Sequence, residues 1–247
     1  MNKMAKTDHQ IAFNNLREWI AEADKLGELR HVEGASWEED IGLATELLQH
    51  DENAPCALFD DIPGYPKGYR VLANFFGATR QNMTLGFPTN LSKVELSEAF
   101  QPRYREAIAN PIPYQVVEDG PVMENVMEGD DVNVLKFPTP KWHEADGGRY
   151  IGTGSFNVTR DPEEDWINVG TYRVMIQDEK TVGFYISPGK HGRIHRQKYM
   201  ADDEPMPVVV VCGVDPLTFL MSSTEVPYGV CEYDVAGALR GKAMDVV

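Results

Sequence analysis

Basic residues are scarce in this chain of 247 residues: 23 lysines and arginines are outnumbered by 39 aspartates and glutamates, which gives a net charge of −16. A protein that binds nucleic acid through its phosphates needs a basic surface, and an anionic membrane surface would repel this chain. The composition therefore excludes nucleic acid and membranes as partners. Hydrophobic residues still make up 42% of the chain, which is enough for a buried core.

Cysteines are few, and long apolar runs are missing. Cys56, Cys212 and Cys231 stand far apart, so they form neither a disulfide framework nor a CxxC metal motif, as is typical of a reducing cytosol. The first ten residues lack the apolar stretch of a signal peptide. The longest apolar run, residues 208–212, is far shorter than the ~20 residues of a membrane span. We therefore expect a soluble, cytoplasmic protein.

The first 120 residues mix helical and strand-like patterns, which indicates an α/β domain. Ser36–Glu39 has the pattern of a capping box before a helix, and Ser92 opens another helix that the prolines of residues 110–113 end. The predicted elements are helices over residues 12–26, 40–48 and 92–108, and strands over residues 56–59 and 69–73.

The sequence becomes rich in β-branched and aromatic residues after about residue 115, and turns separate its strand-like runs. Such a succession is typical of an antiparallel meander. The predicted elements are strands over residues 150–159, 166–176, 181–187 and 207–213, and helices that begin near His191, at Asp215–Pro216 and at Glu232.

Several positions have the residue types of a binding site. His191 and His195 have the spacing of a metal pair on one helix face, although no glutamate follows the first histidine as in metalloproteases; the alternative is a surface helix. Asn168–Arg173 places asparagine and glycine inside a strand pattern, as functional sites often do. Because Asn168 and Arg173 differ in strand parity, they face opposite sides unless a bulge or turn intervenes.

Glu232 and Gly152–Gly154 can also be explained by local structure without a functional role. Glu232 opens a predicted helix, where a carboxylate either binds a ligand or simply complements the helix dipole. Gly152–Gly154 is no dinucleotide fingerprint, because the motif is incomplete and a strand follows it. It indicates a close backbone approach within a sheet.

Short segments along nearly the whole chain occur in a characteristic order and spacing. They are residues 146–150, 151–154, 168–173, 190–191, 222–223, 227–229 and 232–241, with 29–32 and 71–77 near the start. As a set they resemble the UbiD family of reversible decarboxylases, carboxy-lyases that use prenylated FMN.

This resemblance implies an α+β fold, with an N-terminal α/β domain (residues 1–120) followed by an FMN-binding split β-barrel-like domain (residues 121–247). It implies reversible, non-oxidative decarboxylation of an unsaturated or aromatic carboxylic acid, with CO2 as the other product. Full members are considerably longer than this chain. The catalytic glutamates and the domain that aids homo-oligomer formation are therefore expected beyond Val247, which leaves the barrel incomplete at its C-terminus.

The resemblance also implies the site residues. Asn168, His191 and Glu232 fall on the ligands of a Mn²⁺ or Mg²⁺ ion that bridges the protein to the flavin phosphate, and these oxygen and imidazole donors suit an octahedral cation. Arg173 falls on the active-site arginine, which holds the substrate carboxylate and orients the glutamates. The other implied cofactor-binding residues are Thr153, Val169, Gly170, Thr171, Tyr172 and Lys190, and a K⁺ ion is implied at Trp166, Ser222, Ser223 and Glu225.

Two alternatives stay open at the level of sequence. One is a redox flavoprotein that uses unmodified FMN on a similar barrel. The other is a non-catalytic fragment that binds cofactor or mediates assembly, because the expected glutamates lie outside the chain. The substrate itself is not predicted, since the side chains that select it come largely from the expected second half.

Overall fold

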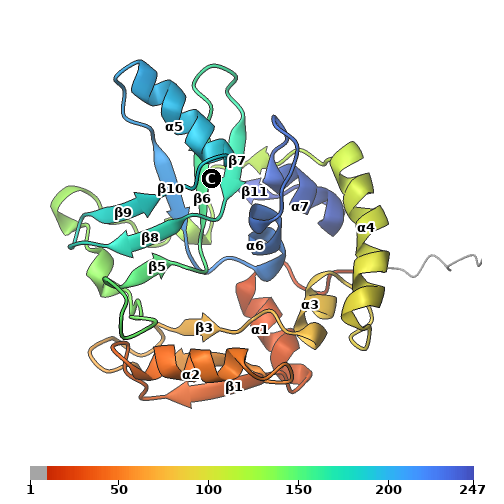
Figure 1. Ribbon diagram of the computed structural model, residues 1–247, viewed down its shortest axis with the longest axis vertical. Coiled ribbons are helices and arrows are strands. Elements are labelled where there is room, and N and C mark those ends of the chain that lie inside the picture. Colours follow the sequence, from red (N-terminus) through yellow and green to blue (C-terminus); the bar gives the residue numbers. More distant parts are fainter. Residues whose placement is uncertain (1–9) are drawn as a thin grey trace, which may run out of the picture.

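A computed structural model describes residues 10–247 of the chain (Figure 1). Helices flank four small sheets, which confirms the mixed helix-and-strand class that the sequence predicts. None of these sheets closes into a barrel within the described residues, so the split barrel stays a prediction. Residues 1–9, which make up most of the segment without a signal-peptide pattern, lie outside the described residues.

The N-terminal part forms a three-stranded sheet with helices around it, at the bottom of the view in Figure 1. Strand β2 is central; it pairs in parallel with β1 and antiparallel with β3. The elements are α1 (Leu16–Lys25), β1 (Leu29–Glu33), α2 (Asp40–Gln49), β2 (Cys56–Asp60), β3 (Val71–Ala73), α3 (Ala78–Thr84) and α4 (Lys93–Ala109).

The two predicted helix starts have different outcomes. At α4 the capping box is present: Ser92 accepts a hydrogen bond from the backbone of Glu95, whose carboxylate accepts the Ser92 N–H at 2.9 Å. At α2 the predicted box over Ser36–Glu39 is wrong. The helix begins at Asp40, three residues after the position that a box at Ser36 requires, and Ser36 exchanges hydrogen bonds with Asp40, whose carboxylate accepts the Ser36 N–H at 2.8 Å.

The C-terminal part contains two separate three-stranded sheets, ordered β10-β6-β7 and β5-β8-β9, and a parallel β4–β11 pair. The single meander predicted from sequence is therefore wrong. Its elements are β4 (Gln115–Val116), η1 (Pro121–Met123), η2 (Gly129–Asp131), η3 (Val134–Lys136), β5 (Tyr150–Gly152), β6 (Phe156–Arg160), β7 (Ile167–Gly170), β8 (Arg173–Ile176), β9 (Val182–Tyr185), α5 (His191–Ala201), β10 (Val208–Val211), α6 (Pro216–Ser223), α7 (Glu232–Arg240) and β11 (Asp245–Val246).

The chain passes between the two sheets at three points: residues 153–155, residues 171–172, and the segment with α5 that joins β9 to β10. At the second point Tyr172 turns inward and is buried, and Arg173 starts a strand of the other sheet. Asn168 and Arg173 therefore belong to different sheets, and a turn intervenes between them, as their opposite parity requires.

One hydrophobic core draws on residues from both ends of the described chain. Phe13 and Trp19 share it with Val235 and Leu239 of α7. Two arginines add long-range hydrogen bonds to backbone carbonyls across the same region: Arg103 donates to Leu239 at 2.6 Å and Arg240 donates to Phe13 at 3.1 Å. Within residues 10–247 no helix combines the length and the apolar character needed to cross a bilayer.

Candidate functional site

A hollow of about 350 Å³ lies where the two C-terminal sheets meet the start of α5. Its walls come from the β5–β6 loop, the β7–β8 turn, the end of β9 and the residue before α5. Five of the predicted cofactor-binding residues therefore line one space, although they come from three separate stretches of sequence. The lining residues are Gly152, Thr153, Ser155, Thr171, Tyr172, Arg173, Tyr185, Ser187 and Lys190.

Two cationic side chains line this hollow. Arg173 is the first residue of β8 and Lys190 is the N-cap of α5, and both are exposed. Neither forms an ion pair or a side-chain hydrogen bond with any residue in the described range 10–247. The positive end of the α5 dipole lies at the same place. In a chain of net charge −16 this spot is suited to an anion.

Tyr172 lines the hollow and separates it from the buried residues Asn168 and Gly192, which it contacts. Its hydroxyl oxygen accepts the Gly192 N–H and an N–H of the Asn168 amide, both at 3.0 Å. A Cβ at Gly170 or Gly192 would lie 2.5 or 2.7 Å from the tyrosine oxygen. Both positions therefore need glycine for close approach, a requirement that the sequence pattern alone did not show for Gly192.

Replacement of Gly192 by alanine is expected to destabilise the chain. The added Cβ forces the tyrosine ring away from two hydrogen bonds, and overpacking of this kind costs about 1–3 kcal/mol. This exceeds the helix propensity that alanine gains at the start of α5. Urea unfolding measures the difference, with Gly147→Ala as the control because nothing lies within 4 Å of that Cβ position. Equal stability of the two variants would contradict the close packing of Tyr172.

Asn168 lies in β7 and is 2% exposed. Its amide nitrogen donates to the Thr159 hydroxyl and to the Tyr172 hydroxyl, each at 3.0 Å. Its carbonyl oxygen, Oδ1, accepts no hydrogen bond from the residues that the structure describes. The amide therefore keeps its oxygen available for a cation.

Glu232 is the first residue of α7 and is 5% exposed. Its carboxylate accepts the backbone N–H of Val169 at 2.7 Å, which ties it to the residue next to Asn168. Burial raises the pKa of Glu232 to about 7, because hydrogen bonds from the backbone N–H groups of Val169 and of Glu232 itself only partly offset the loss of water. A bound cation would stabilise the ionised form.

His191 begins α5, and its ring contacts Trp166 and Tyr228 edge-on, with ring centres 5.3 and 5.8 Å apart. Burial lowers its pKa, so the ring is neutral, the form that binds metals. Within residues 10–247 no group of three or more His, Cys, Asp or Glu side chains is arranged to hold a metal ion. The predicted trio of Asn168, His191 and Glu232 combines an amide with only two such groups, and it stays a prediction.

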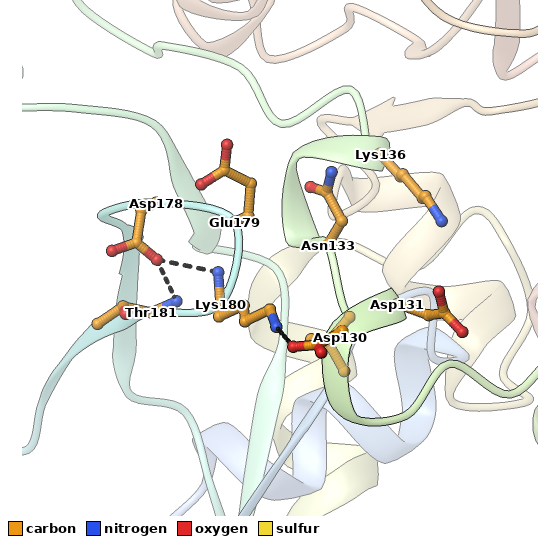
Figure 2. Close-up of a pocket in the computed structure, with 9 residues that line it drawn as sticks. Asp130, Asp131, Asn133, Lys136, Asp178, Glu179, Lys180 and Thr181 are labelled. Carbon is orange, nitrogen blue, oxygen red and sulfur yellow. Dashed lines mark hydrogen bonds and ion pairs between the residues drawn. The ribbon is translucent and has the colours of Figure 1, made fainter.

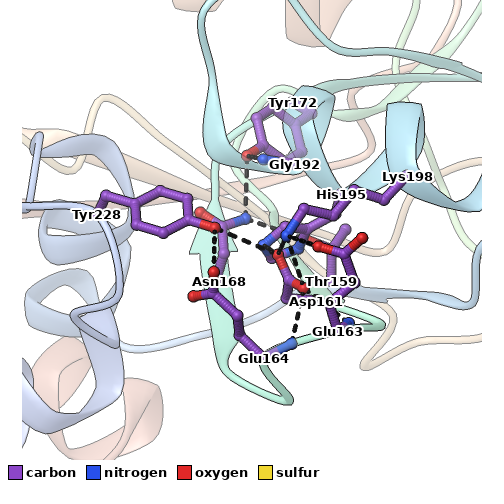
Figure 3. Close-up of polar contacts among 10 residues, drawn as sticks. All are labelled: Thr159, Asp161, Glu163, Glu164, Asn168, Tyr172, Gly192, His195, Lys198 and Tyr228. Carbon is purple, nitrogen blue, oxygen red and sulfur yellow. Dashed lines mark hydrogen bonds and ion pairs between the residues drawn. The ribbon is translucent and has the colours of Figure 1, made fainter.

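His195 faces the interior, although its ring, like that of His191, contacts Trp166 edge-on. It is fully buried, with Nδ1 3.0 Å from the Thr159 hydroxyl and Nε2 3.6 Å from a carboxylate oxygen of Asp161 (Figure 3). Burial lowers the pKa of His195 to about 4, so the ring is neutral. The hydrogen-bonding partner of His195 is Thr159, which argues against a metal-chelating pair of histidines.

Asp161 anchors this buried region. Burial acts to raise its pKa, but hydrogen bonds from Lys198 and from the backbone of Glu164 and Glu163 outweigh it and lower the pKa to about 2. Lys198 donates to Asp161 at 2.8 Å, and this hydrogen bond raises the lysine pKa above its usual range. The pair is therefore ionised at neutral pH.

The predicted K⁺ residues lie in two places: Trp166 just before β7, and Ser222 and Ser223 at the end of α6 with Glu225 just after it. The backbone carbonyls of Trp166, Ser222 and Glu225 each accept one hydrogen bond, from the Asp161 N–H, the Thr171 N–H and the Tyr104 hydroxyl. The hydroxyls of Ser222 and Ser223 both donate to Phe219. Each carbonyl keeps a second lone pair, and the K⁺ site stays a prediction.

Ser155 is a wall residue that sequence reasoning missed. Its hydroxyl is buried, and it has no partner among the described residues. An unpaired buried hydroxyl at the edge of a hollow is suited to a ligand. The signal was present in the break that follows Gly152–Gly154, but the stretch was interpreted as the interior of one strand. Tyr185 is the last residue of β9 and Ser187 lies two residues further on; neither matches a motif, so sequence reasoning missed both.

A second hollow, of about 660 Å³, lies at the turn between β8 and β9 (Figure 2). Acidic side chains dominate it, and Lys180 pairs with Asp130 at 2.8 Å across it. Asp178 accepts the backbone N–H groups of Lys180 and Thr181 and so shapes the turn. None of the predicted site residues lines this hollow.

Two sequence families match the chain. The pattern described as the 3-octaprenyl-4-hydroxybenzoate carboxy-lyase Rift-related domain covers residues 115–247, and that of the N-terminal domain of the same enzyme covers residues 20–99. Both descriptions name a carboxy-lyase. The chain belongs to the UbiD family, as the resemblance predicts.

Curated relatives and solved structures agree with this assignment. The phenolic acid decarboxylase of Sedimentibacter hydroxybenzoicus is 33% identical over 95% of this chain and 50% of its own length. The pyrrole-2-carboxylic acid decarboxylase of Pseudomonas aeruginosa is 31% identical over 84% of this chain and 43% of its own length. This chain therefore spans about half the length of the curated relatives it matches.

Two solved structures share the fold. The vanillic acid decarboxylase of Sedimentibacter hydroxybenzoicus in its closed form has a TM-score of 0.87 and 32% identity, over 95% of this chain and 50% of that one. An evolved dimeric form of the UbiD-class enzyme HmfF from Pelotomaculum thermopropionicum, in complex with prFMN, has a TM-score of 0.83 and 25% identity, over 94% of this chain and 52% of that one.

Proposed function

We propose that this chain forms the prenylated-FMN- and metal-binding half of a decarboxylase that acts reversibly on an unsaturated or aromatic carboxylic acid. The observation that carries the proposal is the hollow with two cations, Arg173 and Lys190, that pair with no residue of the described range, in a strongly acidic chain of the UbiD family. The proposal includes the division into residues 1–120 and 121–247, the split barrel of the second part, and a homo-oligomer of the full-length protein.

The donor set fits the proposed cofactor. Asn168 has a carbonyl oxygen without a partner in the described range, His191 is neutral, and Glu232 is a buried carboxylate held by backbone hydrogen bonds. An amide oxygen, an imidazole and a carboxylate suit Mn²⁺ or Mg²⁺. Lys190 and the start of α5 would hold the flavin phosphate beside that ion.

Prenylated FMN, when bound, supplies the electron sink that lets CO2 leave the substrate. The role of Arg173 is to hold the substrate carboxylate, because a guanidinium stays charged and binds carboxylates with two parallel hydrogen bonds. Ser155 and Tyr172 shape the wall beside it. Proton transfer is assigned to glutamates in the second half that the longer relatives have.

The test is reconstitution of the 247-residue chain with Mn²⁺ and either prenylated FMN or FMN. We expect about one flavin per chain to survive gel filtration, and only when Mn²⁺ is present. Loss of all flavin with Mn²⁺ present would contradict the proposed cofactor site. Decarboxylation of phenolic and heteroaromatic acids is then measured with the chain extended to the length of its relatives. Retention of FMN together with a redox activity and no release of CO2 would support the redox flavoprotein instead.

A further inference from the structure

A row of buried polar side chains lies behind Asn168 (Figure 3). The Thr159 hydroxyl is 3.0 Å from the Asn168 amide nitrogen on one side and 3.0 Å from Nδ1 of His195 on the other. Nε2 of His195 is 3.6 Å from Asp161, which Lys198 holds in its ionised form. Asn168, Thr159, His195 and Asp161 are each at least 98% buried, so water does not replace these contacts.

The contacts favour one direction for each hydrogen bond in this row. A threonine hydroxyl has a single hydrogen. Because the Asn168 amide donates to the Thr159 oxygen, the threonine hydrogen is free to point at Nδ1 of His195. The neutral imidazole then accepts at Nδ1 and carries its own proton on Nε2. That proton faces the Asp161 carboxylate, and at 3.6 Å the negative charge still favours it there although the distance exceeds that of a hydrogen bond.

The opposite tautomer of His195 would favour the reverse direction for the hydrogen bonds between His195, Thr159 and Asn168. A proton on Nδ1 would make His195 the donor to Thr159. The threonine oxygen has two lone pairs and could still accept from Asn168, but its own hydrogen would then have no acceptor among the described residues, which favours donation from the threonine to Asn168. The asparagine amide would turn over, with Oδ1 toward Thr159 and the NH₂ group toward the site, and an NH₂ group does not bind a cation. Tyr172 does not prevent this reversal, because its hydroxyl can donate to Oδ1 as readily as it accepts from Nδ2.

We propose that Asp161, His195 and Thr159 are positioning residues that keep the carbonyl oxygen of Asn168 facing the divalent ion, by holding His195 in its Nε2–H tautomer. This inference rests on the proposed function for the ion itself. It gives His195 a role in cation binding without direct contact with the cation. Residues behind metal ligands commonly change metal affinity 10- to 100-fold when they are replaced.

The first experiment compares variants that keep or remove the acceptor for Thr159. Mn²⁺ affinity of the full 247-residue chain is measured by calorimetry without flavin, and circular dichroism checks the fold. His195→Asn keeps an oxygen near the position of Nδ1, and Thr159→Ser keeps the hydroxyl, so we expect both to bind Mn²⁺ within about threefold of wild type. His195→Leu and Thr159→Val should bind at least about 10-fold more weakly. Folded His195→Leu and Thr159→Val with wild-type affinity would overturn the inference.

The second experiment determines the tautomer of His195 directly in the metal-free wild-type chain. It therefore does not depend on whether the variants fold. Two-bond ¹H–¹⁵N correlation spectra distinguish a proton on Nε2 from one on Nδ1. We expect the Nε2–H form for His195, and a proton on Nδ1 would overturn the inference. If wild type shows Nε2–H but binds no Mn²⁺, the proposed function fails while the hydrogen-bond direction stands.

Discussion

Replacement of Arg173 by alanine is expected to lower the decarboxylation rate per bound flavin by about 100-fold or more, in a protein that joins this chain to the second half its relatives have. A 100-fold loss corresponds to ~2.7 kcal/mol of transition-state stabilisation. The variant loses the group that we propose to hold the substrate carboxylate and to orient the proton donors. Flavin and Mn²⁺ should remain bound, because their proposed ligands are other residues. Stability should change little, since Arg173 is exposed and unpaired within the described part of the chain.

Arg173→Lys tests whether the positive charge alone is sufficient for the role of Arg173. An ammonium group keeps the charge but lacks the planar pair of N–H donors that fits a carboxylate. We therefore expect lysine to restore only a small part of the rate. Full activity of the lysine variant would show that charge alone is sufficient. Loss of flavin from the alanine variant would instead place Arg173 on the phosphate side of the cofactor.

Replacement of His191 by alanine is expected to abolish Mn²⁺ binding and to weaken flavin retention at the same time. The neutral imidazole at the start of α5 is a proposed ligand of the ion that bridges protein and phosphate. Elemental analysis and flavin absorbance after gel filtration measure both losses on one sample. His50→Ala is the matched control, because that side chain is 76% exposed and lies in the N-terminal part.

The outcome for His191 also separates it from His195. If the two histidines chelated one ion together, His195→Asn would lose Mn²⁺ as completely as His191→Ala. We expect His195→Asn to keep the ion, since its role is to accept a hydrogen bond from Thr159. Unchanged Mn²⁺ content in His191→Ala would remove His191 from the ligand set.

Much of the local structure could be predicted because its causes are local. Ser92 and Glu95 form the capping box that their spacing predicts, and Gly27 follows the end of α1 with a left-handed backbone, φ +72°. Strand β1 was missed, because its side chains do not alternate in exposure: only Leu29 is fully buried, and Arg30, His31 and Glu33 are exposed. Its place in the sheet comes from its pairing with β2, which no local pattern shows.

The division into two sheets could not be predicted because it depends on contacts between distant residues. Gly152 approaches Val174 so closely that a Cβ would lie 2.6 Å away, and Tyr172 turns inward between Gly170 and Gly192. The same limit applies to the site. Motifs identified Arg173 and Lys190, but the buried row from Asn168 to Asp161 exists only because β6, β7 and α5 pack together.

The core that Phe13 and Trp19 share with Val235 and Leu239 limits how genes of this family can be recombined. The two family matches are separated by a gap between residues 99 and 115. A chimera with its crossover in this gap would take the two sides of the shared core from different parents. Interiors tolerate such exchange only when volumes are conserved. Chimeras of parents at about 30% identity should therefore exchange the loops around the hollow and keep both segments from one parent.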